Sequence, residues 1–201
     1  MAVGLFIDGS YMYKCWNDRD NLLDYKKIRE VIEKELSDKI VEAYYFNADD
    51  DPPKFAAQNN YLQKPYPTGP GLRVKIGWLN RKPLIWPDFM GTKGAIPVLH
   101  PETGEPYVQT TQKSVDVEFI YYLIKSFTNR RWDKLVIAAG DGDFSKPIQD
   151  LVENHGVELY IIGTPESISP ELSVYASQVF NLNNSQVHKN LGTEKKAKTE
   201  R

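Results

Sequence analysis

Apolar runs that end at or just before an aspartate constrain the fold of this chain more than any other feature. Residues 3–7 are almost wholly apolar and are followed at once by Asp8. Residues 134–139 form a similar run, and Asp141 and Asp143 come directly after it. Short apolar runs of this kind are typical of strands buried on both faces of a sheet. The sequence therefore predicts buried strands whose ends carry acidic side chains.

Helices are predicted between these strands. Residues 24–36 repeat apolar side chains at helical spacing, and Asp24 is suited to be the N-cap. Further helices are predicted at 52–62, 115–127, 144–153 and 171–176, and further strands at 40–46, 72–79, 158–162 and 179–182. This alternation predicts an α/β fold, with a doubly wound, mainly parallel sheet flanked by helices. In such sheets, ligands bind beyond the carboxyl ends of the strands, where the strand order switches.

Residues 81–112 interrupt the alternation, because they are rich in proline and glycine. Short extended pieces at 84–86, 96–99 and 107–110 predict a β-hairpin or loop insertion rather than a second domain. One domain is therefore expected over residues 1–183. Residues 184–201 are polar and are expected to form a disordered tail.

The composition excludes several classes of protein. No apolar run approaches the roughly 18 residues needed to span a bilayer. Cys15 is the only cysteine, which rules out an intrachain disulfide or a cysteine-based metal cluster and makes a reducing cytoplasm the expected location. The start of the chain lacks the basic residues of a signal peptide. The formal net charge is −2, so a site for a polyanion must be local or depend on bound cations.

Four aspartates are expected to meet at one end of the sheet. Asp8, Asp141 and Asp143 follow strands, which places them at the carboxyl edge. Asp116 lies in the first turn of the helix predicted at 115–127. If that helix begins at the same edge, all four carboxylates converge.

These aspartates also have plain structural alternatives. Asp116 is placed to complement a helix dipole, and Asp143 to cap the helix that follows it. Asp8 is harder to explain in this way, because an acid at the end of a buried strand loses solvation unless it has a partner. The closeness of Asp141 to Asp143 favours either protonation or a shared cation. Together, the four positions favour a cation site.

A site built only from carboxylate oxygens favours Mg²⁺ or Mn²⁺ over zinc. Such ions reverse the sign of an acidic pocket, which then accepts a phosphate, and they lower the pKa of an attacking water. No nucleophilic side chain is then required, and the sequence has no convincing Ser/His/Asp or Cys/His arrangement. His100, His155 and His188 fall in the insertion, at a helix end and in the tail, and are expected to be solvated.

Three motifs carry a resemblance to a known family. They are FIDGS at residues 6–10, KSVDV at 113–117 and GDGDF at 140–144. The strand region 156–163 and the closing segment 172–182 fit in order and spacing. The chain thus resembles the NYN-domain proteins, and within them the LabA-like branch of the PIN-like nuclease superfamily, over residues 3–182. Three motifs in order, with the right elements between them, are more specific than any one of them.

The resemblance implies metal binding by Asp8, Asp116, Asp141 and Asp143, a doubly wound α/β fold, and RNA as the usual substrate. By the same resemblance, Ser10 orients the first carboxylate or a metal-bound water, and Lys113 contacts a phosphate. Each of these two residues has an equally good alternative, as a turn hydroxyl and a solvated charge.

Two positions depart from the family pattern. Tyr11 stands where the family often has Asn, and Ser177 stands where it often has an acid. If that Asn helps to position substrate, activity or preference is altered in this chain. The four principal acids are intact.

Basic and aromatic residues suggest where a nucleic acid would lie. The candidates, which lie on the third strand and the start of the insertion, are Arg73, Lys75, Trp78, Arg81 and Lys82. Cations beside aromatic rings track a phosphate backbone and stack unpaired bases. The alternative is a polar strand face with tryptophan in the core. The insertion suits substrate binding and dimerisation equally, so a homodimer is retained beside nucleic acid as a partner.

Three functions compete at this point. The first is an Mg²⁺- or Mn²⁺-dependent nuclease that hydrolyses phosphodiester bonds, in RNA rather than DNA. The second is a non-catalytic nucleic-acid-binding or regulatory module that keeps the fold. The third is a phosphatase of the haloacid dehalogenase type, which ranks last because that chemistry wants a second Asp where this chain has Ser10.

Overall fold

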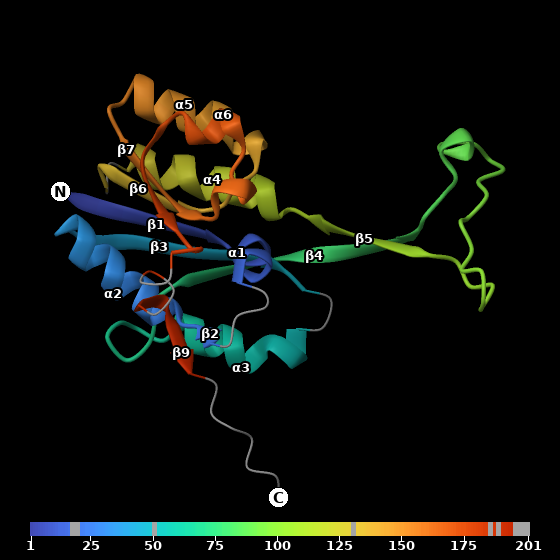
Figure 1. Cartoon of the computed structure of the whole chain (residues 1–201), viewed down its shortest axis with the longest axis horizontal. Helices are drawn as coiled ribbons and strands as arrows, with labels where there is room; N and C mark the ends of the chain where they lie inside the picture. The colour runs from blue at the N-terminus through green and yellow to red at the C-terminus, as the bar shows by residue number, and fades with distance from the viewer. Residues whose placement is uncertain (17–20, 50–51, 130–131, 185–186, 188–189, 195–201) are drawn as a thin grey trace, which may run out of the picture.

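A single seven-stranded sheet forms the centre of the computed structural model, which describes residues 1–16, 21–49, 52–129, 132–184, 187 and 190–194 (Figure 1). The strand order is β5-β4-β3-β1-β6-β7-β8. The strands are β1 (Ala2–Asp8), β3 (Lys39–Ala48), β4 (Arg73–Pro83), β5 (Val108–Lys113), β6 (Lys134–Ala138), β7 (Glu158–Gly163) and β8 (Ala176–Asn181).

All neighbouring strands in this sheet are parallel except β4 and β5. The chain runs outward from β1 through β3 and β4, and then returns to place β6, β7 and β8 on the other side of β1. This confirms the predicted fold class, a mainly parallel, doubly wound α/β sheet. The strand order switches direction beside β1, so the expected ligand position is the carboxyl edge of β1 and its neighbours.

Helices cover both faces of the sheet (Figure 1). One face packs against α1 (Gly9–Trp16), α2 (Tyr25–Leu36) and α3 (Pro52–Gln63), and the other against α4 (Val115–Thr128), α5 (Ser145–Glu153) and α6 (Pro170–Ser173). Three short 3-10 helices complete the described elements: η1 (Pro87–Phe89), η2 (Gly142–Phe144) and η3 (Pro165–Ser167). No helix in the described part of the chain is long and apolar enough to cross a membrane.

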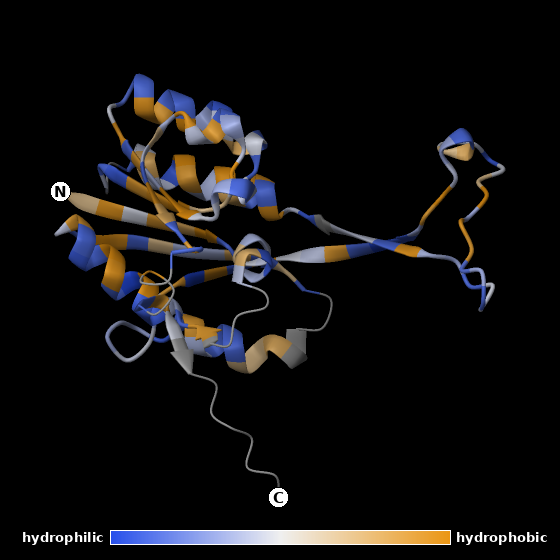
Figure 2. Cartoon of the chain, in the orientation of Figure 1, coloured by the Kyte–Doolittle hydropathy of each residue, from blue (hydrophilic) through white to orange (hydrophobic). Residues whose placement is uncertain are grey.

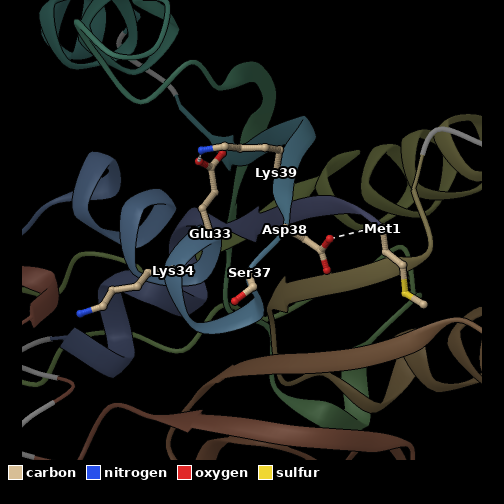
Figure 3. A pocket seen from close by; sticks show the side chains of 6 residues that line it. All are labelled: Met1, Glu33, Lys34, Ser37, Asp38 and Lys39. Carbon is tan, nitrogen blue, oxygen red and sulfur yellow. Dashed lines mark hydrogen bonds and ion pairs between the residues drawn. The ribbon is translucent and has the colours of Figure 1, made fainter.

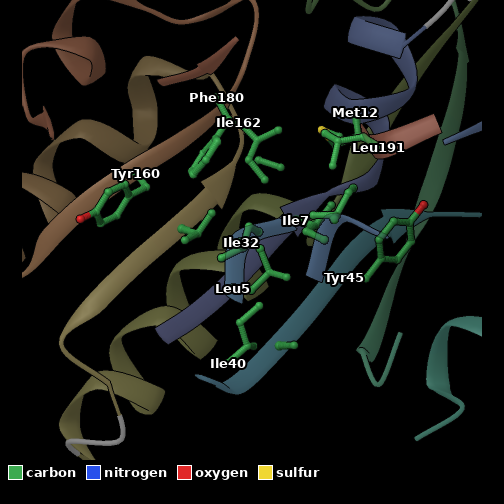
Figure 4. Packing of buried hydrophobic residues seen from close by; sticks show 14 of the residues in the cluster. Leu5, Ile7, Met12, Ile32, Ile40, Tyr45, Tyr160, Ile162, Phe180 and Leu191 are labelled. Atoms are coloured by element: carbon green, nitrogen blue, oxygen red, sulfur yellow. The ribbon is translucent and has the colours of Figure 1, made fainter. Parts of the chain in front are cut away.

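Successive side chains of β1 point to opposite faces of the sheet and pack into two separate hydrophobic cores. Leu5 and Ile7 point into the layer of α1–α3, where they meet Ile32 and Met12 (Figure 4). Phe6 points to the other layer and stacks on neighbouring aromatic rings. Because β1 is buried on both faces, its residues 3–7 are apolar without interruption, as the sequence predicted.

The insertion is a two-stranded arm. The first half of β4 pairs with β3, and its second half, Trp78–Pro83, pairs only with β5. We call residues 78–113 the arm, which projects away from both helical layers (Figure 1). The predicted strand at 72–79 was therefore too short. Strand β4 continues through residues whose proline suggested a loop, because β5 pairs with it along this stretch.

Local signals predicted some helix ends and missed others. Asp24 caps α2 as expected, accepting hydrogen bonds from the backbone of Lys26 and Lys27. The helix α1 was not predicted. The helix predicted at 171–176 ends at Ser173, because β8 begins at Ala176 to pair with β7.

The expected disordered tail is wrong over residues 191–194. The strand β9 (Gly192–Glu194) pairs with the unpredicted strand β2 (Asn21–Leu23), and Leu191 is buried in the core. The apolar side chains of Leu191 and Val187 explain this contact, since both pack against the same core. Residues 195–201 and His188 lie outside the described residues.

Candidate metal centre

The carboxyl edge of the sheet carries the predicted aspartates. Asp8 is the last residue of β1, and Asp141 follows the neighbouring strand β6 by three residues. Asp143 lies within η2, directly after Asp141. The first two therefore stand on adjacent strands at the switch in strand order, as the positional rule for open α/β sheets requires.

Asp8 ends its strand and starts a helix. Its Oδ1 accepts hydrogen bonds from the backbone N–H groups of Ser10 (2.9 Å) and Tyr11 (3.1 Å), so it acts as the N-cap of α1. The Ser10 hydroxyl donates to Oδ1 of Asn47 on β3, at 3.2 Å. The backbone N–H of Ser10 thus orients the Asp8 carboxylate, while its side-chain hydroxyl links α1 to β3 by a hydrogen bond.

Asp116 reaches the same edge because the chain passes close over Gly77 of β4 where it leaves β5 for α4. A Cβ at Gly77 would collide with the carbonyl oxygen of Lys113 and would lie 3.0 Å from Cγ2 of Val115. Glycine at this position lets the chain turn from β5 into α4. Ser114 makes that turn with a positive φ of 74°. The two residues together set the first turn of α4, where Asp116 stands.

The Asp-Gly-Asp loop is closed by its first aspartate. Oδ1 of Asp141 accepts a hydrogen bond from the backbone N–H of Asp143 at 3.0 Å, so Asp141 is the cap of η2. The capping role considered for Asp143 is therefore filled by Asp141. Oε2 of Glu171 lies 3.6 Å from the position that a Cβ on Gly142 would take. A further carboxylate thus borders the loop.

The four aspartates act on one another electrostatically. The pKa of Asp8 is raised by its loss of solvation and further by the charge of Asp116, and these effects outweigh its two backbone hydrogen bonds. The pKa of Asp116 is also raised, by loss of solvation and by the charges of Asp141 and Asp143. Asp116 therefore lies within electrostatic range of all three other acids.

The donor chemistry of this centre fits a hard divalent cation. Carboxylates that repel one another and resist ionisation gain from a positive charge between them. Among the described residues, no three acidic, histidine or cysteine side chains are close enough to surround an ion directly. Mg²⁺ keeps several water ligands and takes only one or two carboxylates from a protein, so an ion bound here would take its remaining ligands from water.

The Tyr11 side chain reaches the ends of β6 and β7 and packs beside Gly140, the residue before Asp141. Its hydroxyl lies 2.6 Å from Oγ of Ser167, beyond the ends of β6 and β7. Cβ atoms at Gly140 and Gly163 would both collide with the Tyr11 ring or hydroxyl. The departure from the family pattern at Tyr11 is thus matched by two glycines that make room for it.

Ser177 lies near the amino edge of the sheet, at a register shift between β8 and β7. The aspartates occupy the opposite, carboxyl edge. The second departure from the family pattern is therefore remote from the acidic centre.

Lys75, one of the predicted basic residues, lies in the same cross-strand row as Asp8. Asp8 pairs with Phe46, and Phe46 pairs with Lys75, so the three form one row across β1, β3 and β4. Paired residues share a face, so Lys75 lies about 10 Å from Asp8, two strand spacings away, on the α4 side. Its Nζ sits 4.2 Å from the centre of the Tyr122 ring.

The other predicted nucleic-acid contacts are divided between faces. Arg73 shares the face of Lys75 but forms an ion pair with buried Glu42 at 2.7 Å. Alternation along β4 places Arg81 on that face as well, and Trp78 and Lys82 on the opposite one. The proposed cation–aromatic cluster is therefore not a single surface. Lys113 ends β5, paired with Trp78.

Sequence reasoning missed several residues at this edge. Asn47 and Asp49 stand at the end of β3, next to β1, and Asp49 is buried. They follow an apolar strand, which is the signal that identified Asp8. Lys14 on α1 lowers the pKa of Asp8 by its charge, and Glu171 borders the Asp-Gly-Asp loop, but neither has a local signal in the sequence.

A pocket of about 480 Å³ lies elsewhere, at the amino ends of β1 and β3 (Figure 3). Its lining includes Met1, Glu33, Asp38 and Lys39, and its charged groups pair with one another: Asp38 with the N-terminal amine at 2.8 Å, and Glu33 with Lys39 at 2.8 Å. Ligands of open α/β sheets bind at the other edge, so this pocket is separate from the acidic centre.

Comparisons with known proteins agree with this architecture. A crystal structure of a protein of unknown function from Vibrio parahaemolyticus superimposes with a TM-score of 0.58 and 20% identity, over 89% of this chain and 90% of that one. No curated protein matches the sequence. The profile of the NYN domain, a member of the PIN-like nuclease superfamily, matches residues 2–183. The chain therefore belongs to the NYN domain family.

Proposed function

We propose that this chain is a metal-dependent nuclease that hydrolyses phosphodiester bonds at the acidic centre. Asp8, Asp116, Asp141 and Asp143 are its metal-binding and catalytic residues, and Mg²⁺ or Mn²⁺ is its cofactor. Membership of the NYN family supports this reaction class. We also assign the chain to the LabA-like branch, on the motifs at residues 6–10, 113–117 and 140–144.

The observation that carries the proposal is the position of Asp116 among the other three acids. Its charge raises the pKa of Asp8, and its own pKa is raised by Asp141 and Asp143. A structural N-cap needs no such neighbours. Four carboxylates from β1, α4 and the loop after β6 gain most from their proximity if a divalent cation joins them.

The chain's own residues position this centre. Oδ1 of Asp8 accepts two backbone hydrogen bonds, so Oδ2 is the oxygen that would bind a metal ion. Asp141 is oriented in the same way by the backbone of Asp143. The bound ion would supply an attacking water of lowered pKa and offset the charge of the phosphate. No nucleophilic side chain is needed for that reaction.

We propose RNA as the substrate, on the family resemblance. Lys75 is the best-placed predicted cation, because it stands in the row of Asp8 and on the side of α4. Its backbone lies about 10 Å from that of Asp8, so its ammonium, which lies over the Tyr122 ring, would contact a phosphate near the one being cleaved. The exposed ring of Tyr121 on α4, near Lys125, offers a surface on which a base can stack.

Cleavage of labelled single-stranded and duplex RNA and DNA tests the proposal. Wild type, Asp141→Asn and the control Asp150→Asn are each assayed with Mg²⁺, with Mn²⁺ and with EDTA. Asn at position 141 keeps the oxygen that accepts from Asp143, so it removes charge without removing the cap. Asp150 is an exposed acid on α5, outside the centre.

We expect wild type and Asp150→Asn to cleave with metal and not with EDTA. The cleavage rate of Asp141→Asn should be lower by at least about 100-fold, the usual effect of removing one group that stabilises charge in the transition state. RNA should be cut in preference to DNA. If wild type binds a nucleic acid but cuts none with either metal, the chain is a non-catalytic binding module and the nuclease proposal is wrong.

A further inference from the structure

The arm exposes apolar side chains that no core contains. Among the described residues, both hydrophobic clusters of the protein lie outside residues 78–113. Trp86 is 52% exposed, Leu99 51% and Met90 69%. The other large apolar side chains exposed on the arm are Trp78, Leu84, Phe89, Ile96, Tyr107 and Val108. Exposed apolar groups on this scale mark an interaction surface.

Backbone hydrogen bonds give the distal arm a fixed shape. The N–H of Leu84 donates to the carbonyl of Tyr107 at 2.7 Å, and the N–H of Val98 donates to the carbonyl of Leu84 at 2.7 Å. The N–H of Trp86 donates to the carbonyl of Ile96 at 3.0 Å. The apolar side chains are therefore held on a β-ribbon that does not pack against the rest of the protein (Figure 1). Apolar segments occur along the length of this ribbon (Figure 2).

The overall charge of the arm does not favour nucleic acid. Its cations are Arg81, Lys82, Lys93 and Lys113, and its acids are Asp88, Glu102 and Glu105. A surface that attracts a polyanion has a clear excess of cations. The near balance of charge, together with the exposed apolar groups, favours a protein surface as the partner.

Charge is nevertheless separated along the arm. The base, Trp78–Pro83 paired with Val108–Lys113, carries Arg81 on one face, Lys82 and Lys113 on the other, and no acid. The distal part, residues 84–107, carries the three acids and one lysine. A second arm that ran in the opposite direction would bring its acidic distal part to this basic base, and its basic base to this acidic distal part. Both contacts are attractive, whereas arms aligned in the same direction would oppose like charges.

We propose that the arm docks antiparallel onto the arm of a second copy of this chain, about a two-fold axis. Such an interface is isologous, because the same surface serves both copies. It lays the apolar side chains of each distal part on the base of the other arm, where Trp78 and Val108 are exposed, and pairs each basic base with the other, acidic distal part. The inference rests on the arm alone and is independent of the proposed nuclease activity.

Light scattering during size-exclusion chromatography, over a concentration series, tests this arrangement. Two charge-reversed variants are compared with wild type: a base variant, Arg81→Glu with Lys82→Glu, and a distal variant, Glu102→Lys with Glu105→Lys. A matched control reverses two exposed charges on α5, Lys146→Glu and Glu153→Lys. Circular dichroism and thermal unfolding check that each variant folds, which is expected because the arm contributes nothing to the described cores.

Wild type and the α5 control should reach twice the mass of the 23.0 kDa chain. Each arm variant alone should self-associate at least roughly tenfold more weakly, because like charges then face each other at both contacts. An equimolar mixture of the base and distal variants should dimerise again, since each base then meets an opposite charge. The proposal is overturned if wild type stays monomeric up to its solubility limit, or if the mixture dimerises no better than the separate variants.

Discussion

The carboxylate of Asp8 at the end of β1 lies within the electric field of Asp116 at the start of α4. Loss of solvation raises the pKa of Asp8, and the charge of Asp116 raises it further. Gly77 makes this proximity possible, because it lets the chain from Lys113 to Val115 pass close over β4 before α4 begins. The acidic centre therefore depends on this close backbone approach as much as on the acids themselves.

The first prediction concerns the charge of Asp116 without metal. Its folded-state pKa lies above the ordinary 3.8, so its contribution to stability is present below pH 3.8 and is lost as the pH rises through the folded-state pKa. At pH 7 in EDTA, Asp116→Asn should therefore relieve the cost of desolvating this charge and its repulsion by Asp141 and Asp143. Glu118→Gln is the matched control, because Glu118 shares the first turn of α4 and its helix dipole.

Chemical unfolding of the two variants measures this difference. In EDTA at pH 7, Asp116→Asn should be more stable than Glu118→Gln by roughly 0.5–1 kcal/mol, a value limited by solvent screening. The difference should shrink as the pH falls below 3.8, where Asp116 is protonated in both the folded and the unfolded state. Equal stability of the two variants at pH 7 would show that the charge of Asp116 is destabilised neither by loss of solvation nor by its acidic neighbours.

The second prediction concerns metal binding to the folded state. Mn²⁺ or Mg²⁺ at about 100 times its Kd should stabilise wild type by about 2.7 kcal/mol, and EDTA should reverse this. Asp8→Asn should lose most of the effect while still capping α1, since Asn keeps the accepting oxygen. Thermal unfolding with and without metal gives the result. An equal response of Asp8→Asn and wild type would remove Asp8 from the metal site.

Much of the fold follows from local sequence signals. The apolar run at residues 3–7 identified the central strand, and Asp24 identified the start of α2. The helix α1 was missed because Asp8 was considered only as a ligand, although it also caps that helix. The pairing of β2 with β9 depends on contacts between distant residues, so no local pattern could reveal it.

The candidate site, too, was predictable only where local sequence signals place its residues. Aspartates directly after strands could be predicted, because the carboxyl edge of a parallel sheet is a fixed place in the fold. The convergence of Asp116 depended on where α4 begins, which Gly77 sets through a tertiary contact. The separation of Lys75 from Lys82 follows from alternation along β4, but only once that strand is known to continue to Pro83.

The third prediction concerns Gly77. In Gly77→Ala, the new Cβ would press on the carbonyl oxygen of Lys113 and on Val115, and would push the start of α4 away from β1. Overpacking of this kind destabilises by about 1–3 kcal/mol. Metal affinity, followed by calorimetry, should fall as well, because Asp116 moves with α4. Gly94→Ala is the control, since a Cβ there meets nothing within 4 Å.

The fourth prediction tests the fit of Tyr11 against Gly163. Gly163→Ala should destabilise the fold by roughly 1–3 kcal/mol, because the new Cβ collides with the Tyr11 hydroxyl. Tyr11→Phe alone should cost about 1 kcal/mol, by removing the hydrogen bond to Ser167. The double variant should be more stable than the sum of these effects, because Phe lacks the colliding oxygen. A strictly additive double-variant cycle would contradict this packing.

The last prediction separates the two faces of β4 in nucleic-acid binding. Lys75 stands in the row of Asp8, beside α4, whereas Lys82 lies on the opposite face of the strand. Lys75→Ala should therefore weaken binding of single-stranded RNA and reduce the slope of log K against log salt by about 1, the signature of one lost phosphate contact. Lys82→Ala should leave both affinity and slope unchanged. Fluorescence anisotropy over a salt series, in the catalytically impaired Asp141→Asn background, measures both quantities without cleavage. If Lys82→Ala has the larger effect, the nucleic acid follows the other face of the arm, away from α4 and from the four aspartates.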